Sequence, residues 1–239
     1  MKLCNTFYHN QSVRECFIIF LQVSALMLEG SSTSYAQFAK WFTNTNSSLE
    51  LEFRTREPDG LLLYLDDGGY YDFLELKLVS GGLRCRFNFG SGAETLALGR
   101  ALNTGAWHRV ELGLLQDKLT LTLDMMRKSQ NLQNKEQDFM LGNFTINSAV
   151  YIGGLPPWYS SKLKNLALPS VVFEPRFRGE IRNVIYADSE DGNVKQQQMM
   201  AFKVCTSSHC PDFFNLNFYN YKILSSMKSF KVQYYPNTI

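Results

Sequence analysis

The sequence predicts an all-β protein, a sandwich of two antiparallel sheets. Short runs of alternating apolar and polar residues follow one another from residue 47 to about residue 187, and this period of two is typical of strands with one buried face. Glycine, proline and asparagine turns separate the runs, and no stretch carries a long helical period. Half-buried strands need a second layer over their apolar faces, so two packed sheets are expected.

Three runs show the alternation most clearly. In each, leucine, valine or phenylalanine alternates with a charged residue or threonine, so each strand should have one wet and one dry face. Their expected buried positions are Leu49, Leu51 and Phe53; Val110, Leu112 and Leu114; and Leu119, Leu121 and Leu123. We also expect Trp107 at the start of a central strand, with its ring between the sheets.

Residues 60–78, GLLLYLDDGGYYDFLELKL, predict a β-hairpin. Asp66, Asp67 and the two glycines that follow supply the turn chemistry between two apolar runs. Because adjacent residues in a turn point apart, and such acidic turns are usually solvated, the two carboxylates are not expected to form a catalytic pair.

Length and composition set broad limits on function. The chain has 239 residues, of which 45% are hydrophobic and 19% charged, and its net charge is +2. That is enough apolar material for one good core or one domain with extensions. A charge so near neutral gives no reason to expect a nucleic-acid partner or a general attraction to anionic membranes.

The N-terminus predicts a secretory signal peptide. Lys2 and Arg14 precede an apolar run over residues 16–28, which is shorter than the roughly 20 residues of a membrane span. Small residues follow at Gly30, Ser31 and Ser32, where a peptidase can cut. The alternatives are a buried helix or an uncleaved signal anchor. No other segment is apolar enough to span a bilayer, so we expect a secreted protein or the ectodomain fragment of a cell-surface protein.

Three parts are therefore expected. They are a signal peptide over residues 1–30, a domain over 31–210, and a divergent tail over 211–239 that lies outside the core. The tail is rich in aromatic residues and asparagine but lacks clean alternation. In an exported protein, the sequons that begin at Asn46 and Asn143 become usable glycosylation sites.

The cysteines are interpreted by compartment. Two of the five lie in the targeting region, which leaves Cys85, Cys205 and Cys210 in the mature chain. Cys85 lies in an alternating strand and is expected to be a buried free thiol. Cys205 and Cys210 bracket four residues, and in a secreted protein a short disulfide is favoured over metal binding. His209 lies between them, but no second pair of ligands completes a zinc site.

Several motifs together resemble the first laminin-G-like (LNS) domain of neurexins, of the invertebrate type. They are GLLLYLDDGG with DFLEL, WHRV at 107–110, YIGGLP at 151–156 and FEPRFRG at 173–179, and the resemblance covers residues 34–210. It implies a concanavalin-like jelly-roll sandwich that binds extracellular or cell-surface proteins in cell-cell or synaptic adhesion. Related first domains carry paired cysteines where this chain has FTNTN at 42–46, so that disulfide is absent here.

Other function classes are less well supported. Ser91 is not in a strained nucleophile turn, and His108 at a strand start is expected to be structural, so no enzyme is predicted. The alternative function is binding of a sulfated or other glycan by a basic face. That face would consist of Lys162, Lys164, Arg176, Arg178 and Arg182, although solvated strand charges are the plainer interpretation.

The resemblance also implies a calcium site at the rim of the sandwich. Asp72 would supply a carboxylate, Phe89 a backbone carbonyl, and the loop 143–147 the remaining oxygens, from Asn143, Thr145 and Asn147. Calcium accepts such mixed oxygen ligands, and few protein ligands imply weak affinity, on the order of 10⁻⁴ to 10⁻³ M. The alternative is that Asp72 caps the hairpin through nearby amides. Both interpretations stay open at this point.

Overall fold

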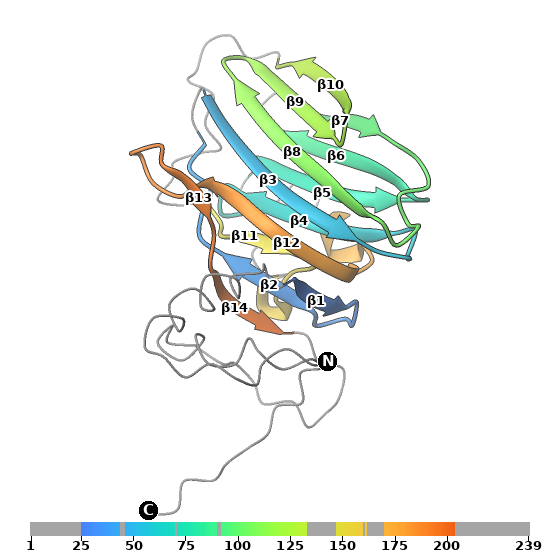
Figure 1. Cartoon of the computed structure of the whole chain (residues 1–239). Coiled ribbons are helices and arrows are strands. Elements are labelled where there is room, and N and C mark those ends of the chain that lie inside the picture. The colour runs from blue at the N-terminus through green and yellow to red at the C-terminus, as the bar shows by residue number, and fades with distance from the viewer. Residues whose placement is uncertain are drawn as a thin grey trace, which may run out of the picture.

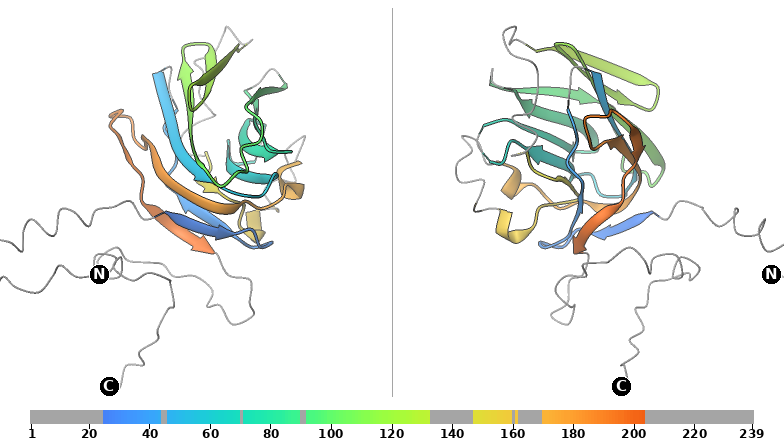
Figure 2. Two further views of the ribbon diagram at one scale, coloured as in Figure 1. Left: turned by 45° about the vertical axis from the view of Figure 1, so that its right-hand side comes forward. Right: turned by 90° about the vertical axis from the view of Figure 1, so that its left-hand side faces the viewer.

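The computed structural model describes residues 25–43, 46–69, 71–89, 92–132, 147–159, 161 and 170–203. These residues form two antiparallel sheets packed face to face (Figures 1 and 2). Sheet A runs in the order β1 (Leu26–Glu29), β12 (Arg178–Ala187), β3 (Asn46–Arg54), β8 (Trp107–Leu115), β9 (Lys118–Leu123) and β10 (Met126–Asn131), and β13 (Val194–Gln196) also pairs with β12.

Sheet B is the second layer. Its order is β14 (Met199–Lys203), β2 (Tyr35–Phe38), β11 (Val150–Ile152), β4 (Gly60–Asp66), β5 (Phe73–Val79), β6 (Gly82–Asn88) and β7 (Ala93–Leu98). A short 3-10 helix, η2 (Ser170–Phe173), precedes β12. The predicted all-β sandwich is confirmed, and the hairpin predicted over residues 60–78 is the β4–β5 pair.

The register explains the burial pattern. Leu49 pairs with Leu112, and Leu112 in turn with Leu121, so apolar residues of three neighbouring strands point into the space between the sheets. The expected inner positions of β3, β8 and β9 are all buried. Cys85 on β6 is a free thiol with no exposed surface, as predicted, and burial raises its pKa.

Trp41 and Trp107 lie on different sides of the structure. Trp41, just after β2, is 1% exposed and belongs to the core between the sheets. Trp107 lies on the outer face of sheet A, because the inward positions of β8 are those of Val110 and Leu112, and Trp107 has the opposite parity. The prediction that the Trp107 ring lies between the sheets is therefore wrong.

A second, smaller apolar cluster covers the outer face of sheet B. Its members come from β2, β4, β5 and β11 and from the segment after β11 that folds back over the sheet: Tyr35, Leu61, Tyr64, Phe73, Tyr151, Leu155, Tyr159 and Val171. Sheet B is thus covered on both faces over β4, whose residues are all buried.

Part of the predicted leader is folded as a strand. Strand β1 lies inside the segment that was predicted as residues 1–30 of a leader. The tail 211–239 and the pair Cys205 and Cys210 lie outside the described residues. Within the part that the structure describes, no helix is long and apolar enough to cross a membrane.

Candidate functional site at the rim of sheet B

The topology brings three of the predicted calcium ligands to one rim of sheet B, where the ends of its central strands meet. Neighbouring strands β11, β4, β5 and β6 alternate in direction, so the start of β11, the end of β4, the start of β5 and the end of β6 meet there. Asn147 precedes β11, Asp72 precedes β5 and Phe89 follows β6. Asn143 and Thr145 lie outside the described residues.

The turn between β4 and β5 is held by the Asp67 carboxylate. It accepts hydrogen bonds from the backbone N–H of Tyr71 at 3.0 Å and of Asp72 at 3.0 Å. The Asp67 N–H donates to the Asp72 carbonyl, also at 3.0 Å. Gly68 and Gly69 both have positive φ, 86° and 90°, which glycine adopts without strain. Asp67 thus caps amides of this turn, and the backbone of Asp72 is fixed at its mouth.

Asp66 at the end of β4 is the buried anchor of this rim. Its carboxylate accepts hydrogen bonds from the hydroxyls of Tyr64 at 3.0 Å and Tyr159 at 2.6 Å, and from the N–H of Gly68 at 3.0 Å. Burial raises the pKa of Asp66, while these hydrogen bonds oppose the rise. Both turn carboxylates are buried, Asp66 at 0% and Asp67 at 7% exposure. The expectation that they are solvated is wrong, because the segment carrying Tyr159 covers this end of the sheet.

Asp66 also positions the segment that contains Asn147, just before β11. Its backbone N–H donates to Ser148 Oγ at 2.9 Å, and its carbonyl accepts from the Ser148 N–H at 2.9 Å. Asn147 itself is 4% exposed, and its side-chain oxygen Oδ1 is buried without a hydrogen-bond partner among the described residues. A buried polar oxygen of this kind is normally satisfied, so Asn147 has an acceptor available for a ligand at the rim.

Asn88 ties the end of β6 to the same turn. Its side-chain N–H donates to the Tyr71 carbonyl at 3.3 Å, and its Oδ1 accepts from the Gly92 N–H at 3.0 Å. Asn88 also pairs with Phe73 in the sheet, and the Phe89 ring packs against Phe87 at 5.3 Å between centroids. These contacts hold the backbone of Phe89 beside the turn that carries Asp72.

The donor set fits calcium better than a softer ion. Asp72, the Phe89 carbonyl and Asn147 offer only oxygen, and calcium takes carboxylate, amide and carbonyl oxygens together. The described residues contain no group of three or more histidines, cysteines, aspartates or glutamates able to hold a metal. A site here therefore depends on one carboxylate and on neutral oxygens, which favours weak binding.

The remaining predicted residues are not gathered into one site. Asn46 is exposed at the first position of β3, so its sequon is accessible, and glycosylation stays a prediction. His108 is held by a 2.8 Å contact from Nδ1 to Asp124 Oδ2 and lies against the Phe53 ring. Of the predicted basic face, Arg182 pairs with Glu52 at 2.6 Å and Arg178 approaches Glu57 at 3.6 Å. Lys162 and Lys164 lie outside the described residues.

Sequence reasoning missed the buried anchor. Tyr64 and Asp66 lie two residues apart on one strand and therefore on one face, which is a signal that the sequence does contain. The partners of Asp66 from elsewhere in the chain, Ser148 and Tyr159, lie 82 and 93 residues further along. No local pattern links them to β4.

Comparison of the sequence with known protein families shows which family the chain belongs to. The model of the laminin G domain matches residues 53–189, more than half of the chain. The chain belongs to the laminin G domain family. Neurexin 1 of Drosophila melanogaster is 51% identical over 181 residues, 75% of this chain and 10% of that protein. Neurexin-2 of Homo sapiens is 35% identical over 166 residues, 68% of this chain and 9% of that protein. The resemblance to neurexins, nearer to the insect relative, is confirmed.

Solved structures show the same fold. Domains LG4-5 of the mouse laminin alpha1 chain align with a TM-score of 0.56 and 21% identity, over 73% of this chain and 42% of that one. The LG1-3 region of the laminin alpha2 chain aligns with a TM-score of 0.54 and 19% identity, over 74% of this chain and 34% of that one. At these identities the likeness shows the sandwich fold alone. The chain spans about a tenth of the length of the neurexins it matches.

Proposed function

We propose that this laminin G domain is an extracellular recognition module that binds other cell-surface or secreted proteins in cell-cell or synaptic adhesion. The observation that carries the proposal is the 51% identity with Drosophila Neurexin 1 over 181 residues. The domain is proposed to act by binding and not by catalysis. The rim of sheet B suits this role because it combines fixed turns with the exposed aromatic residues Tyr71 and Trp158.

We further propose that the rim holds Ca²⁺ through Asp72, the Phe89 carbonyl and Asn147. Support comes from the shared edge of the four strands and from the buried oxygen of Asn147. Bound calcium would add positive charge to a surface shaped by the β4–β5 turn, where an acidic partner group could complete its coordination. Asp66 would act as a positioning residue, since its backbone fixes Ser148 and its carboxylate fixes Gly68.

The protein-binding proposal is tested with the secreted chain on cells that display single adhesion-receptor ectodomains. Saturable binding to particular ectodomains is expected, together with loss of binding when Tyr71 and Trp158 are both changed to alanine. The matched control is Met125→Ala, which alters a 98% exposed apolar residue in the β9–β10 turn of sheet A. Binding to no ectodomain, or equal binding by all variants, would contradict the proposed role of this rim.

The calcium proposal is tested separately by calorimetric titration with Ca²⁺. We expect a dissociation constant on the order of 10⁻⁴ to 10⁻³ M, with heat lost in Asp72→Asn and reduced in Asn147→Ala. Asp117→Asn removes an exposed carboxylate from the β8–β9 turn and should leave the heat unchanged. If the parent chain gives no heat at millimolar calcium, the calcium site is ruled out, and the adhesion proposal is unaffected.

A specific observation keeps glycan binding as the second candidate. The guanidinium of Arg176 makes no hydrogen bond or ion pair with the residues that the structure describes, and desolvation lowers its pKa. Arg178 and Arg182 face glutamates instead. A sulfated or carboxylated glycan could therefore pair with Arg176. A glycan array on which binding disappears in Arg176→Gln would favour this candidate over protein recognition.

A further inference from the structure

Strand β1 is built into the sandwich. Its residues pair in register with the first part of β12, from Leu26 opposite Ile181 to Glu29 opposite Arg178. Leu28 is 1% exposed and belongs to the core between the sheets. It packs so closely on Gly153 that a side chain there would collide with it. Residues 26–29 therefore have the burial and pairing of a structural strand.

The connection from β1 to β2 is also folded tightly. Gly30 has a φ of 72°, and a Cβ placed on it would lie 2.9 Å from the Cβ of Arg178. The N–H of Ser34 then donates to the carbonyl of Ser31 at 2.9 Å, which closes a turn that leads into β2. Figure 1 shows this crossing from sheet A to sheet B at the lower edge of the sandwich. A cut at Gly30, Ser31 or Ser32 would fall within this turn and remove β1 from the mature domain.

We propose that the leader ends at Ala25 and that the mature chain begins at Leu26, with β1 as its first strand. The residues before the bond are Val23, Ser24 and Ala25, which give the short side chains that signal peptidase needs at the first and third positions before its cut. Water adds across the Ala25–Leu26 peptide bond, leaving a carboxyl group on Ala25 and an α-amino group on Leu26.

A cut after Ala25 gives a leader of suitable length and also leaves β1 in the mature domain. The apolar run before the bond, residues 16–23, is eight residues long and follows Lys2 and Arg14, within the range of a secretory leader. The bond lies directly before the first paired residue of β1. The domain thus keeps every strand that the structure describes. The proposal depends on export of the chain and not on what the domain binds.

The direct test is N-terminal sequencing, with intact mass after deglycosylation, of the full chain secreted from insect cells. We expect the sequence to begin LMLEGS at Leu26. A chain that begins at Ser31, Ser32 or Thr33, or one that keeps residues 1–25, would overturn the proposal. Ala25→Leu should shift or prevent cleavage, whereas Ser32→Leu, at an exposed position, should leave it unchanged. The reverse result would place the cut after Ser32.

A second test does not depend on processing variants. If β1 stays in the mature domain, Leu28→Ala should lower the melting temperature of the secreted protein by about 5–10 °C, because it empties a core position. Met27→Ala changes the neighbouring residue of the same strand, which is 62% exposed, and should shift it by less than about 2 °C. If Leu28→Ala abolishes secretion and Met27→Ala does not, the result also supports the proposal. Parent-like melting of both variants would show that β1 has been removed.

Discussion

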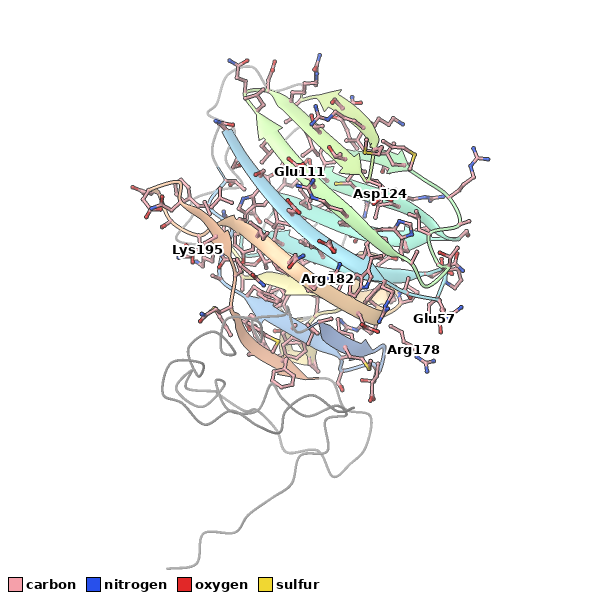
Figure 3. The ribbon with its side chains drawn as sticks, viewed as in Figure 1. Glu57, Glu111, Asp124, Arg178, Arg182 and Lys195 are labelled. Carbon is pink, nitrogen blue, oxygen red and sulfur yellow. The ribbon has the colours of Figure 1, made fainter. Side chains whose placement is uncertain are left out.

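The outer faces of the two sheets differ in what covers them. On sheet A, charged residues of β3, β8 and β12 form ion pairs in water: Glu50 with Arg109 at 2.5 Å, Glu52 with Arg182 at 2.6 Å and Glu180 with Arg54 at 2.6 Å. Figure 3 shows Glu111 of β8 and Arg182 of β12 on this face, with β3 between these two strands. The guanidinium groups of Arg54 and Arg182 lie over the Trp107 ring, 4.9 and 4.0 Å from its centroid.

On sheet B, the outward-facing carboxylates of β4 and β5 are buried. Asp66 is satisfied by two tyrosine hydroxyls. Glu75 is 1% exposed and contacts Lys77 at 2.6 Å, and Lys77 also contacts Glu174 from the covering segment. Burial raises the pKa of Glu75, although Lys77 opposes the rise. The comparison teaches that strand alternation fixes which way a side chain points, whereas a distant segment determines whether that direction leads to water.

The largest loss of stability is expected when the core residue Trp41 is replaced. Trp41→Ala should lower the free energy of unfolding by about 3–5 kcal/mol, the range for buried tryptophan. Trp107→Ala should lower it by only about 1–2 kcal/mol, because two partly exposed cation-π contacts contribute about 0.5–1 kcal/mol each. Chemical denaturation of both variants measures the difference. An equal loss would mean that the outer face of sheet A is as well packed as the core.

The next effect concerns the buried anchor of sheet B. Asp66→Ala removes the acceptor for Tyr64, Tyr159 and Gly68, and leaving buried donors unsatisfied should lower the free energy of unfolding by about 3 kcal/mol. Asp66→Asn keeps one oxygen acceptor and should lose less. The matched control is Glu111→Ala on the outer face of sheet A, for which a change within about 0.5 kcal/mol is expected. A similar small loss in Asp66→Ala would show that the cover over β4 is open to water.

The buried carboxyl group of Asp66 should also make the stability of the domain depend on pH. Because burial raises the pKa of Asp66 above the ordinary 3.8, the folded state binds its proton more tightly than the unfolded state. Between the unfolded-state pKa and the higher folded-state pKa of Asp66, the free energy of unfolding should therefore fall as pH rises. Above the folded-state pKa this contribution no longer changes. Asp66→Asn lacks this contribution, so its stability relative to the parent should improve from pH 4 to pH 7. Urea unfolding across this range measures the trend, and a relative loss for Asp66→Asn with rising pH would reverse the assignment.

The smallest effect belongs to the exposed pairs of sheet A. Arg109→Ala breaks the contact with Glu50, but the Arg109 side chain is 57% exposed, and exposed pairs contribute about 0.2–1 kcal/mol and are screened by salt. We expect a loss of less than about 1 kcal/mol that shrinks further in 1 M NaCl. Denaturation at two salt concentrations checks it. A larger loss of unfolding free energy that does not shrink in salt would mean that the Arg109–Glu50 pair is shielded from solvent.

Much of the fold follows from local pattern, and the site follows from it in part. The alternation around Leu51, Val110 and Leu121 predicted the inner face of sheet A, and the acidic glycine turn predicted the β4–β5 hairpin. Asp72, Phe89 and Asn147 were assigned to a rim through family resemblance, and the strand order brings them to one edge. The side of the sheet on which Trp107 lies was missed, because its large aromatic side chain was given a core position against the parity that Val110 and Leu112 set.

The sequence by itself determined the all-β class, the strands with a period of two, the buried thiol of Cys85 and the membership of the laminin G family. These properties depend on residues that are close together in the chain, where strand geometry imposes the pattern. Only the tertiary structure decided that Asp66 and Glu75 are buried, that Trp107 is outside, and that β1 belongs to the domain. Each of these depends on a contact between residues far apart in sequence, and the free energy of such a contact is determined by the folded packing rather than by local propensity.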